Sequence, residues 1–242
     1  MSDSTHFISD LHLDDQRPEL THAFERYCKG PAANAQRLFI LGDLFEAWLG
    51  DDDDSETAER VRRALASLSE AGTDISVLGG NRDFLIGQRF ADDIGGHLLD
   101  EQALIDLHGQ RALLLHGDSL CTRDTAYMQW RQQCRSEAWQ SQFLGMDIET
   151  RRQAVKAYRQ QSTEANSNKA EDIMDVTPEE VSRVLIEAGS QLMIHGHTHR
   201  PAMHRLQVSG QPAKRIVLAD WDSEINWLSW DASGFQLNFE PV

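Results

Sequence analysis

The chain has few cysteines and no long apolar run. Its three cysteines among 242 residues, Cys28, Cys121 and Cys134, are scattered and form no CxxC pair. Such a set is not the framework of a disulfide-stabilised protein, so we expect a reduced, cytosolic compartment. The first residues show no basic segment followed by a long apolar one, and no window approaches the length of a transmembrane helix. We therefore expect any membrane contact to be peripheral.

Positive charge is also scarce. The 23 Lys and Arg residues are outnumbered by 39 Asp and Glu, which gives a formal net charge of -16 and a pI near 4.9. Such a surface repels nucleic acid phosphates, so we expect no nucleic acid partner. The 40% of hydrophobic residues is enough for a sizeable core. We expect residues 1–242 to form one domain that carries an insertion.

Short apolar runs, each followed by a polar cluster, recur along the chain. They are His6–Ser9, Arg37–Leu41, Asp74–Leu78, Ala112–Leu115 and Gln191–Ile194. Their length is typical of strands buried on both faces, and Ile216–Leu218 and Trp227–Trp230 indicate further strands. Helical spacing predicts a helix over Glu56–Ala71, and a capping box at Thr177–Glu180 predicts one that reaches about Ala188. Alternating strands and helices indicate an α/β fold with its site beyond the carboxyl ends of the strands.

Residues from about 123 to 175 carry no strand pattern, and we interpret them as a helical lid inserted over the site. The stretch Arg123–Lys169 holds eight Lys or Arg against five Asp or Glu, a local positive excess in an acidic chain. A helix would place Arg159, Ser162, Asn166 and Lys169 on one face. That face suits a sugar phosphate, and it fits a solvated helix surface equally well.

Five motifs combine carboxylate, imidazole and amide side chains at predicted strand ends. They are Asp10-Leu11-His12, Gly42-Asp43, Gly80-Asn81-Arg82-Asp83, His116-Gly117-Asp118 and Gly196-His197-Thr198-His199. Residues two apart in a tight loop can turn toward one ion, and the glycines permit such loops. One such residue alone is more often a cap or a hydrogen-bonding group, but the joint set predicts a metal site. The mixed ligand chemistry suits manganese or a similar divalent metal.

The order DxH, GD, GN, H and GHxH resembles the calcineurin-like metallophosphoesterase superfamily over most of the chain outside the insertion. The resemblance implies a four-layer αββα sandwich, with two β-sheets packed together and helices outside. It also implies two divalent metal ions, with Mn²⁺ as the expected species. By resemblance, the ligands are Asp10, His12 and His199 for one ion, Asn81, His116 and His197 for the other, and Asp43 as the bridge.

Other histidines and acids lack partners of this kind. His195 lies outside the GHxH register, and we expect it in the core or in support of the ligands. Four consecutive acids, Asp51–Asp54, could attract a cation, but a solvated loop fits them better. The remaining histidines are expected to be structural or exposed: His6, His22, His97, His108 and His204.

Arg82 departs from the pattern of the superfamily, where most members carry a histidine after the GN that can protonate a leaving group. Arginine stays charged near neutral pH, but its guanidinium can stabilise phosphoryl charge through paired hydrogen bonds. The alternative is that Arg82 braces its loop, for example through Asp83. A phosphate monoester that leaves a pyrophosphate needs no proton donor. Arg82 therefore favours pyrophosphate cleavage over cleavage of an alkyl phosphodiester.

Longer motifs indicate a narrower group. SDLHL, LGDLFEAWLGDD, GNRDFL, LLHGDSLCTRD and HGHTHRP resemble the family of bacterial UDP-2,3-diacylglucosamine diphosphatases of the lipid A pathway. The resemblance implies a UDP-linked diacylated glucosamine as substrate, with UMP and 2,3-diacylglucosamine 1-phosphate as products, at the cytoplasmic face of the inner membrane. It also implies substrate contacts by Asn81, Arg82, Asp124, Ser162, Asn166, Lys169 and His197, to which the helix-face argument adds Arg159.

The expected reaction is attack by a metal-activated water on the uridine-linked phosphorus, with Asp43, Asn81 and Arg82 as the catalytic residues. The aromatic residues of the insertion could line a cleft for acyl chains or could pack the lid helices together: Tyr127, Trp130, Trp139 and Phe143. Two alternatives stay open, namely another metallophosphoesterase, such as a nucleotide pyrophosphatase or phosphodiesterase, and a non-catalytic metal-bound scaffold. No obligate protein partner is expected.

Overall fold

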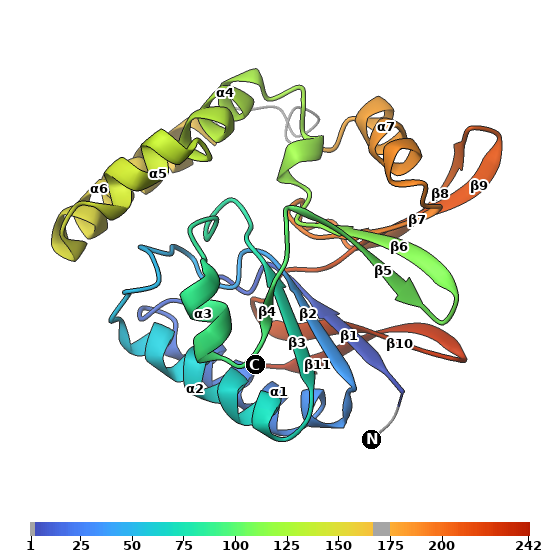
Figure 1. Cartoon of the computed structure of the whole chain (residues 1–242), viewed down its shortest axis with the longest axis horizontal. Helices are drawn as coiled ribbons and strands as arrows, with labels where there is room; N and C mark the ends of the chain where they lie inside the picture. Colours follow the sequence, from blue (N-terminus) through green and yellow to red (C-terminus); the bar gives the residue numbers. More distant parts are fainter. Residues whose placement is uncertain (1–2, 167–174) are drawn as a thin grey trace.

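Two β-sheets pack face to face, with helices on both outer sides and a further group of helices above them (Figure 1). The computed structural model describes the backbone of residues 3–166 and 175–242, and the side chains of these residues other than 161–166. The layers follow the order helix, sheet, sheet, helix. The predicted α/β fold class and its αββα sandwich are therefore confirmed.

The first sheet has the strand order β11-β10-β1-β2-β3-β4. Its strands are β1 (Thr5–Ile8), β2 (Arg37–Leu41), β3 (Asp74–Leu78), β4 (His97–Leu98), β10 (Glu224–Asp231) and β11 (Gly234–Pro241). Strands β1, β2 and β3 pair in parallel, so their carboxyl ends share one edge. In β2, Ile40 faces the outer helices and Phe39 faces the second sheet. Both faces are buried, which explains the uninterrupted apolar run.

The second sheet has the strand order β5-β6-β7-β9-β8. Its strands are β5 (Gln102–Leu107), β6 (Gln110–Leu115), β7 (Leu192–His195), β8 (Ala202–Val208) and β9 (Gln211–Val217). Strands β6, β7 and β9 are parallel. Leu114 of β6 and Ile194 of β7 pack against Phe7 and Leu78 of the first sheet. This shared core holds the two sets of strand ends in a fixed relation.

Helices cover the outer face of each sheet. The first sheet is covered by α1 (Pro18–Lys29), α2 (Glu56–Glu70) and α3 (Gln88–Asp93), and the second by α7 (Pro178–Ala188), with short turns η1 (Ala32–Asn34) and η2 (Asp118–Leu120) between elements. Helix α2 confirms its prediction to within one residue. For α7, Pro178 occupies the first turn as predicted, but the capping box is wrong. The Thr177 hydroxyl accepts from the Thr122 hydroxyl (2.7 Å) instead, and Glu180 pairs with Arg183.

Three helices form the lid: α4 (Thr125–Cys134), α5 (Glu137–Leu144) and α6 (Ile148–Asn166). They lie above the carboxyl ends of the strands, apart from both sheets (Figure 1). The described part of the insertion is helical and contains no strand, as predicted. Lys169 lies outside the described residues. No helix in the described part of the chain is both long and apolar enough to cross a membrane.

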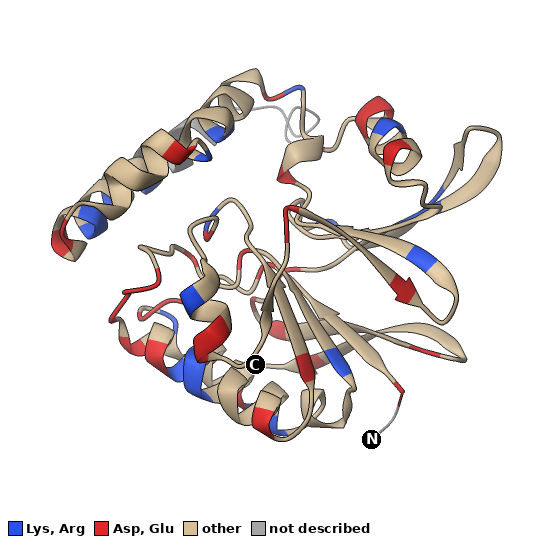
Figure 2. Cartoon of the chain, in the orientation of Figure 1, with Lys and Arg blue, Asp and Glu red and all other residues tan. Residues whose placement is uncertain are grey.

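The four acids Asp51–Asp54 form a loop, as the sequence predicts, but only Asp52 and Asp54 are exposed to solvent. Asp53 is buried, and Asp51 accepts from the backbone N–H of Gly87 (2.9 Å). Asp52 and Asp54 form ion pairs with Arg151 and Arg152 of α6. Figure 2 shows this acidic loop beneath the basic end of the lid. The sequence did not predict these two ion pairs, because Arg151 and Arg152 lie about a hundred residues away along the chain.

Candidate active site

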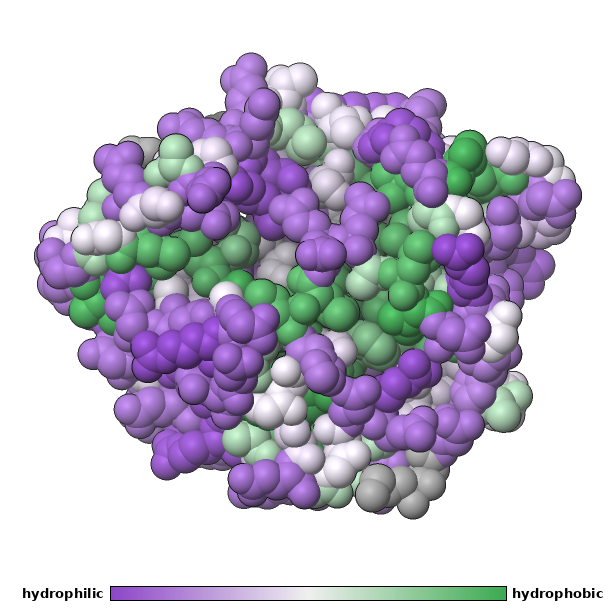
Figure 3. Space-filling view, in the orientation of Figure 1, coloured by the Kyte–Doolittle hydropathy of each residue, from purple (hydrophilic) through white to green (hydrophobic). Residues whose placement is uncertain are grey.

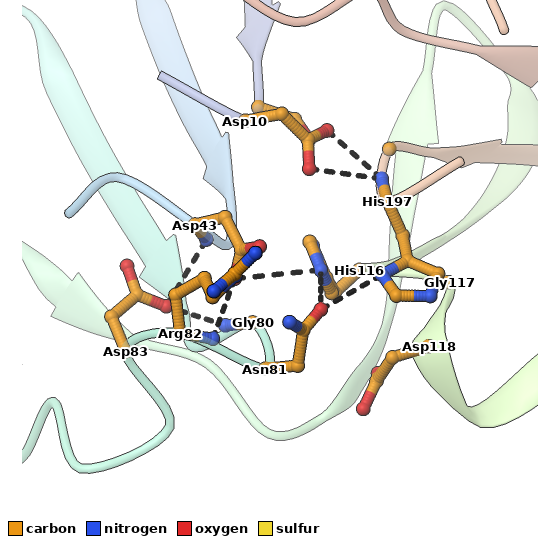
Figure 4. Close-up of polar contacts among 12 residues, drawn as sticks. Asp10, Asp43, Gly80, Asn81, Arg82, Asp83, His116, Gly117, Asp118 and His197 are labelled. Carbon is orange, nitrogen blue, oxygen red and sulfur yellow. Dashed lines mark hydrogen bonds and ion pairs between the residues drawn. The ribbon is translucent and has the colours of Figure 1, made fainter. Parts of the chain in front are cut away.

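The five polar motifs meet at the carboxyl ends of β1, β2, β3, β6 and β7. Figure 4 shows Asp10, Asp43, Asn81, His116 and His197 converging from separate strands of both sheets. The predicted ligands are therefore brought together by the fold. His12 and His199 complete the set through contacts with each other and with Asp10 and Asp43.

Most of these residues have a backbone conformation that residues other than glycine rarely adopt. Asp10, His12, Asp43, His197 and His199 have φ between 49° and 69°, and they are five of the seven non-glycine residues with positive φ in the described chain. This region is disfavoured for residues with a Cβ, so surrounding contacts must enforce it. The backbone N–H groups of Asp10 and His12 donate to Gly42 and Asp43 carbonyls at 3.1 and 3.0 Å. The loops thereby turn their side chains inward.

The first ligand group consists of Asp10, His12 and His199, whose donor atoms lie within 4.8 Å of one another. His12 Nε2 lies 3.3 Å from His199 Nε2, which is 3.4 Å from Asp10 Oδ1. The outer nitrogens face carboxylates: His12 Nδ1 lies 2.9 Å from Glu46, and His199 Nδ1 lies 3.3 Å from Asp220. A carboxylate that accepts a hydrogen bond from Nδ1–H, as Asp220 does from His199, leaves the Nε2 lone pair directed into the site.

The second ligand group converges on Asn81. Its Oδ1 lies 2.9 Å from His116 Nε2 and 2.8 Å from His197 Nδ1. His116 Nδ1 donates to the Leu41 carbonyl at 2.9 Å, because a carbonyl can only accept. In a neutral His116 ring, Nε2 therefore presents a lone pair to the Asn81 oxygen. Two facing lone pairs require a proton or a metal ion between them.

Asp43 stands between the two groups. Its Oδ1 lies 3.5 Å from His116 Nε2, and its Oδ2 lies 3.9 Å from His12 Nε2. Asp10 also reaches both sides, since its carboxylate lies within 4.8 Å of donor atoms of Asp43 and His116. The sequence placed Asp10 with the first group alone. Gly80 permits this crowding, because a Cβ there would come 2.2 Å from Asp43 Oδ1.

The electrostatics of the site favour bound positive charge. Burial alone lowers the pKa of His116, but the carboxylates of Asp43 and Asp10 overcome this effect and raise it to about 10. Burial likewise lowers the pKa of His199, and Asp10 and Asp220 raise it to about 10. The buried carboxyl of Asp43 keeps a pKa below its usual range because of His116. Excess buried negative charge of this kind stabilises cations.

Asp83 links two of the ligand loops through hydrogen bonds. Its fully buried carboxylate accepts from the backbone N–H groups of Gly80 (2.7 Å), Asp43 (3.1 Å) and Leu44 (2.7 Å). It is thus engaged by the backbone and does not brace Arg82. The Arg82 guanidinium instead lies beside Asp43 and Glu46, at 4.0 and 3.9 Å.

A cleft of about 980 Å³ runs from these ligands to the underside of the lid. Figure 3 shows apolar side chains gathered below the lid and toward the middle of the molecule. Of the predicted substrate contacts, those that line the cleft are Asn81, Arg82, Asp124, Arg159 and His197. Asp124 also caps α4 by accepting from the backbone N–H of Tyr127 (3.1 Å). Ser162 and Asn166 belong to α6, but their side chains lie outside the described residues, as does Lys169.

The aromatic residues of the insertion line a cleft, and some of them also pack the lid helices together. All four line the cleft: Tyr127, Trp130, Trp139 and Phe143. Trp139 stacks on Phe143 of the same helix at 4.9 Å and meets Trp130 of α4 edge to face at 5.5 Å, so Trp130 and Trp139 pack two lid helices together. The walls of the cleft are thus a rigid aromatic layer.

Three carboxylates around the site had no predicted role, although Asp118 belongs to one of the five motifs. Glu46 contacts His12 and forms an ion pair with Arg159 of the lid. Asp220 contacts His199, and Asp118 is buried next to α4. Asp220 follows the predicted strand Ile216–Leu218, so the rule that found the other motifs could have found it. His195 is buried as expected, with its Nε2 3.2 Å from Arg215.

Comparisons with known proteins agree with this geometry. Residues 4–201 match the family model of calcineurin-like phosphoesterases. A Cellvibrio japonicus protein named UDP-2,3-diacylglucosamine hydrolase is 50% identical over 97% of this chain and 98% of its own. A Marinobacter nauticus protein of the same name is 48% identical over 93% and 92%. Among solved structures, an archaeal phosphodiesterase is similar with a TM-score of 0.48 and 12% identity, over 98% of this chain and 99% of its own.

Proposed function

The chain belongs to the family of calcineurin-like phosphoesterases, and we propose that it hydrolyses the pyrophosphate bond of UDP-2,3-diacylglucosamine to UMP and 2,3-diacylglucosamine 1-phosphate. One observation carries the proposal beyond the names of the relatives. The single cleft that begins at the ligand groups and Arg82 continues between aromatic side chains of the lid. It offers a polar end to a pyrophosphate and an apolar end to acyl chains.

We further propose that two Mn²⁺ ions occupy the ligand groups. Asp10, His12 and His199 would hold one ion, Asn81, His116 and His197 the other, and Asp43 would bridge them. The mixture of carboxylate, imidazole and amide donors suits Mn²⁺. The facing lone pairs of Asn81 and His116 fit a cation between them. When bound, the ions lower the pKa of water and neutralise phosphoryl charge.

The protein's own side chains orient the reacting groups. The Asp43 backbone is fixed by Asp83, which holds its carboxylate at the centre of the site. Arg82 lines the cleft beside Asp43, and its guanidinium can donate paired hydrogen bonds to the departing phosphate. That phosphate leaves without a proton, so a permanent cation is sufficient at this position. In this proposal, the activated water attacks the uridine-linked phosphorus, and 2,3-diacylglucosamine 1-phosphate is the leaving group.

The lid supplies the remaining contacts in this proposal. Arg159 lines the cleft and is already oriented by Glu46, close to His12. With Asp124, and with Ser162, Asn166 and Lys169, it would hold the sugar phosphate. The aromatic walls would take the acyl chains. Binding energy from these remote groups aligns the pyrophosphate with the nucleophile.

Such a substrate implies that the protein works at the cytoplasmic face of the inner membrane as a peripheral protein. Leu144, at the end of α5, has 42% of its surface exposed. The exposed Arg152 lies on the neighbouring helix. Exposed apolar and basic side chains on the lid suit the surface of an anionic bilayer.

A matched pair of substrates tests the proposal. Purified protein with Mn²⁺ is given UDP-2,3-diacylglucosamine or the non-acylated UDP-glucosamine, and UMP release is measured. We expect kcat/KM for the acylated substrate to be larger by at least about 10²-fold, since several buried methylenes contribute on the order of 0.8 kcal/mol each. Equal turnover of the two substrates would favour a general nucleotide pyrophosphatase.

A further inference from the structure

Asp118 lies between the ligand groups and the lid, and the reaction described above does not use it. Its side chain is buried and follows His116 by two residues. Its Oδ2 accepts from the Tyr127 hydroxyl at 2.6 Å, from Arg131 Nε at 2.7 Å and from Arg135 Nη2 at 3.4 Å. All three donors belong to α4 or its C-cap. One buried carboxylate therefore holds the first helix of the lid through three hydrogen bonds.

The same donors contact the group of Asn81, His116 and His197. The Tyr127 ring stacks on the His197 ring, with 6.3 Å between centroids and 29° between planes. Arg135 donates to the carbonyl of Gly80, the residue before Asn81, at 3.0 Å. Figure 4 shows Asp118 on the same side of the site as Asn81 and His197. A closed path thus leads from His116 through Asp118 and α4 back to Asn81.

The two ligand groups differ in what orients them. In the first group, the outer nitrogens of His12 and His199 face the carboxylates of Glu46 and Asp220. In the second group, His116 donates to a backbone carbonyl. Asp83 supports this second group through the backbone N–H of Gly80, and Asp118 supports it from the side of the lid, acting through Tyr127 and Arg135. Residues that orient metal ligands control the affinity of the metal as well as its geometry.

We propose that Asp118 is a positioning residue for the ion held by Asn81, His116 and His197, and that it couples this ion to the lid. The inference rests on the proposed two-metal function and assigns the support of one ion to one carboxylate. Loss of the Asp118 charge leaves Arg131 and Arg135 without their buried counter-charge, so both shift. The shift moves Tyr127 away from His197 and Arg135 away from Gly80.

Glu101 provides a matched control. It pairs with the same two arginines from outside, at 2.7 Å from Arg131 and 2.5 Å from Arg135. Its side chain is half exposed. Glu101→Gln therefore removes an ion pair from the same cations without touching the path to the ligands.

The test is a calorimetric titration of Mn²⁺ into metal-free protein, for the parent, Asp118→Asn and Glu101→Gln. We expect Asp118→Asn to bind one ion like the parent and the other about 10–100-fold more weakly. Glu101→Gln should bind both ions like the parent. Parent-like affinity for both ions in Asp118→Asn would overturn the proposal. So would equal weakening of both ions, or an equal loss in Glu101→Gln, because either result would indicate general bracing of the fold.

Two further variants keep the test decisive if Asp118→Asn lacks the circular dichroism spectrum of the parent. Tyr127→Phe and Arg135→Gln each remove one donor to Asp118. Selective weakening of one ion in either variant supports the proposal, and parent-like binding in both overturns it. No substrate takes part in these titrations. Failure of the proposed function would show separately, as a parent protein that binds two ions and releases no UMP.

Discussion

Asp43 Oδ1 lies 3.5 Å from His116 Nε2, and only 2% of each side chain is exposed. This distance is too long for a good hydrogen bond between two buried partners. It leaves room for a shared ion, and the other Asp43 oxygen faces His12 in the same manner. The bridging role of Asp43 is the part of the proposal from which most of the predictions follow.

Asp43→Ala is expected to reduce turnover by at least about 10³-fold, or roughly 4 kcal/mol of barrier, because no neighbouring side chain can replace the bridge. The protein should still fold, since the Asp43 backbone keeps its bond to Asp83. Steady-state rates with Mn²⁺ are compared with those of Asp74→Ala, an exposed acid at the start of β3. Activity within about tenfold of the parent, ~1.4 kcal/mol, would rule out the two-metal assignment.

Chelation should abolish activity, and added Mn²⁺ should restore it. The ligand set provides three donors and a bridge to each of two ions, so we expect the recovered activity to saturate as the second ion binds. Metal content is measured by mass spectrometry on the same samples that are assayed. Full activity of protein shown to be free of metal would contradict the account.

Arg82→Ala should lower the rate by about 10²–10³-fold while the metal content stays at the parent level, because it removes one charge stabiliser. Arg82→His should not restore the rate with the natural substrate, whose leaving phosphate needs no proton. With an artificial diester that has a poor alkoxide leaving group, Arg82→His should have a higher rate than Arg82→Ala. If Arg82 only braces its loop, melting temperature and metal content will fall together with little loss of turnover per bound metal.

Asp52→Asn should raise KM for the acylated substrate about tenfold, ~1.4 kcal/mol, with little change in metal content. Asp52 forms an ion pair with the buried Arg151 at the start of α6, the helix that also carries Arg159. The matched control is Asp54→Asn, whose partner Arg152 is exposed. If KM of Asp52→Asn is unchanged, this ion pair does not position the lid.

Much of the fold and of the ligand set could be predicted from the sequence, because both depend on local patterns. Runs such as Leu38–Leu41 are apolar throughout because they face two cores, and their ends mark the site. Partners distant along the chain left no such signal. Asp52 and Asp54 pair with Arg151 and Arg152 of α6, which lie far away along the chain. The left-handed backbone of Asp10 and His12 is likewise enforced by hydrogen bonds to the next loop.

The measurement that tests the central claim most directly is hydrolysis of UDP-2,3-diacylglucosamine in water enriched in oxygen-18, with mass spectrometry of both products. The account predicts one labelled oxygen in UMP and none in 2,3-diacylglucosamine 1-phosphate, because the nucleophile attacks the uridine-linked phosphorus. Label in the lipid phosphate would place the attack on the other phosphorus. Release of UDP in place of UMP would contradict pyrophosphate cleavage altogether.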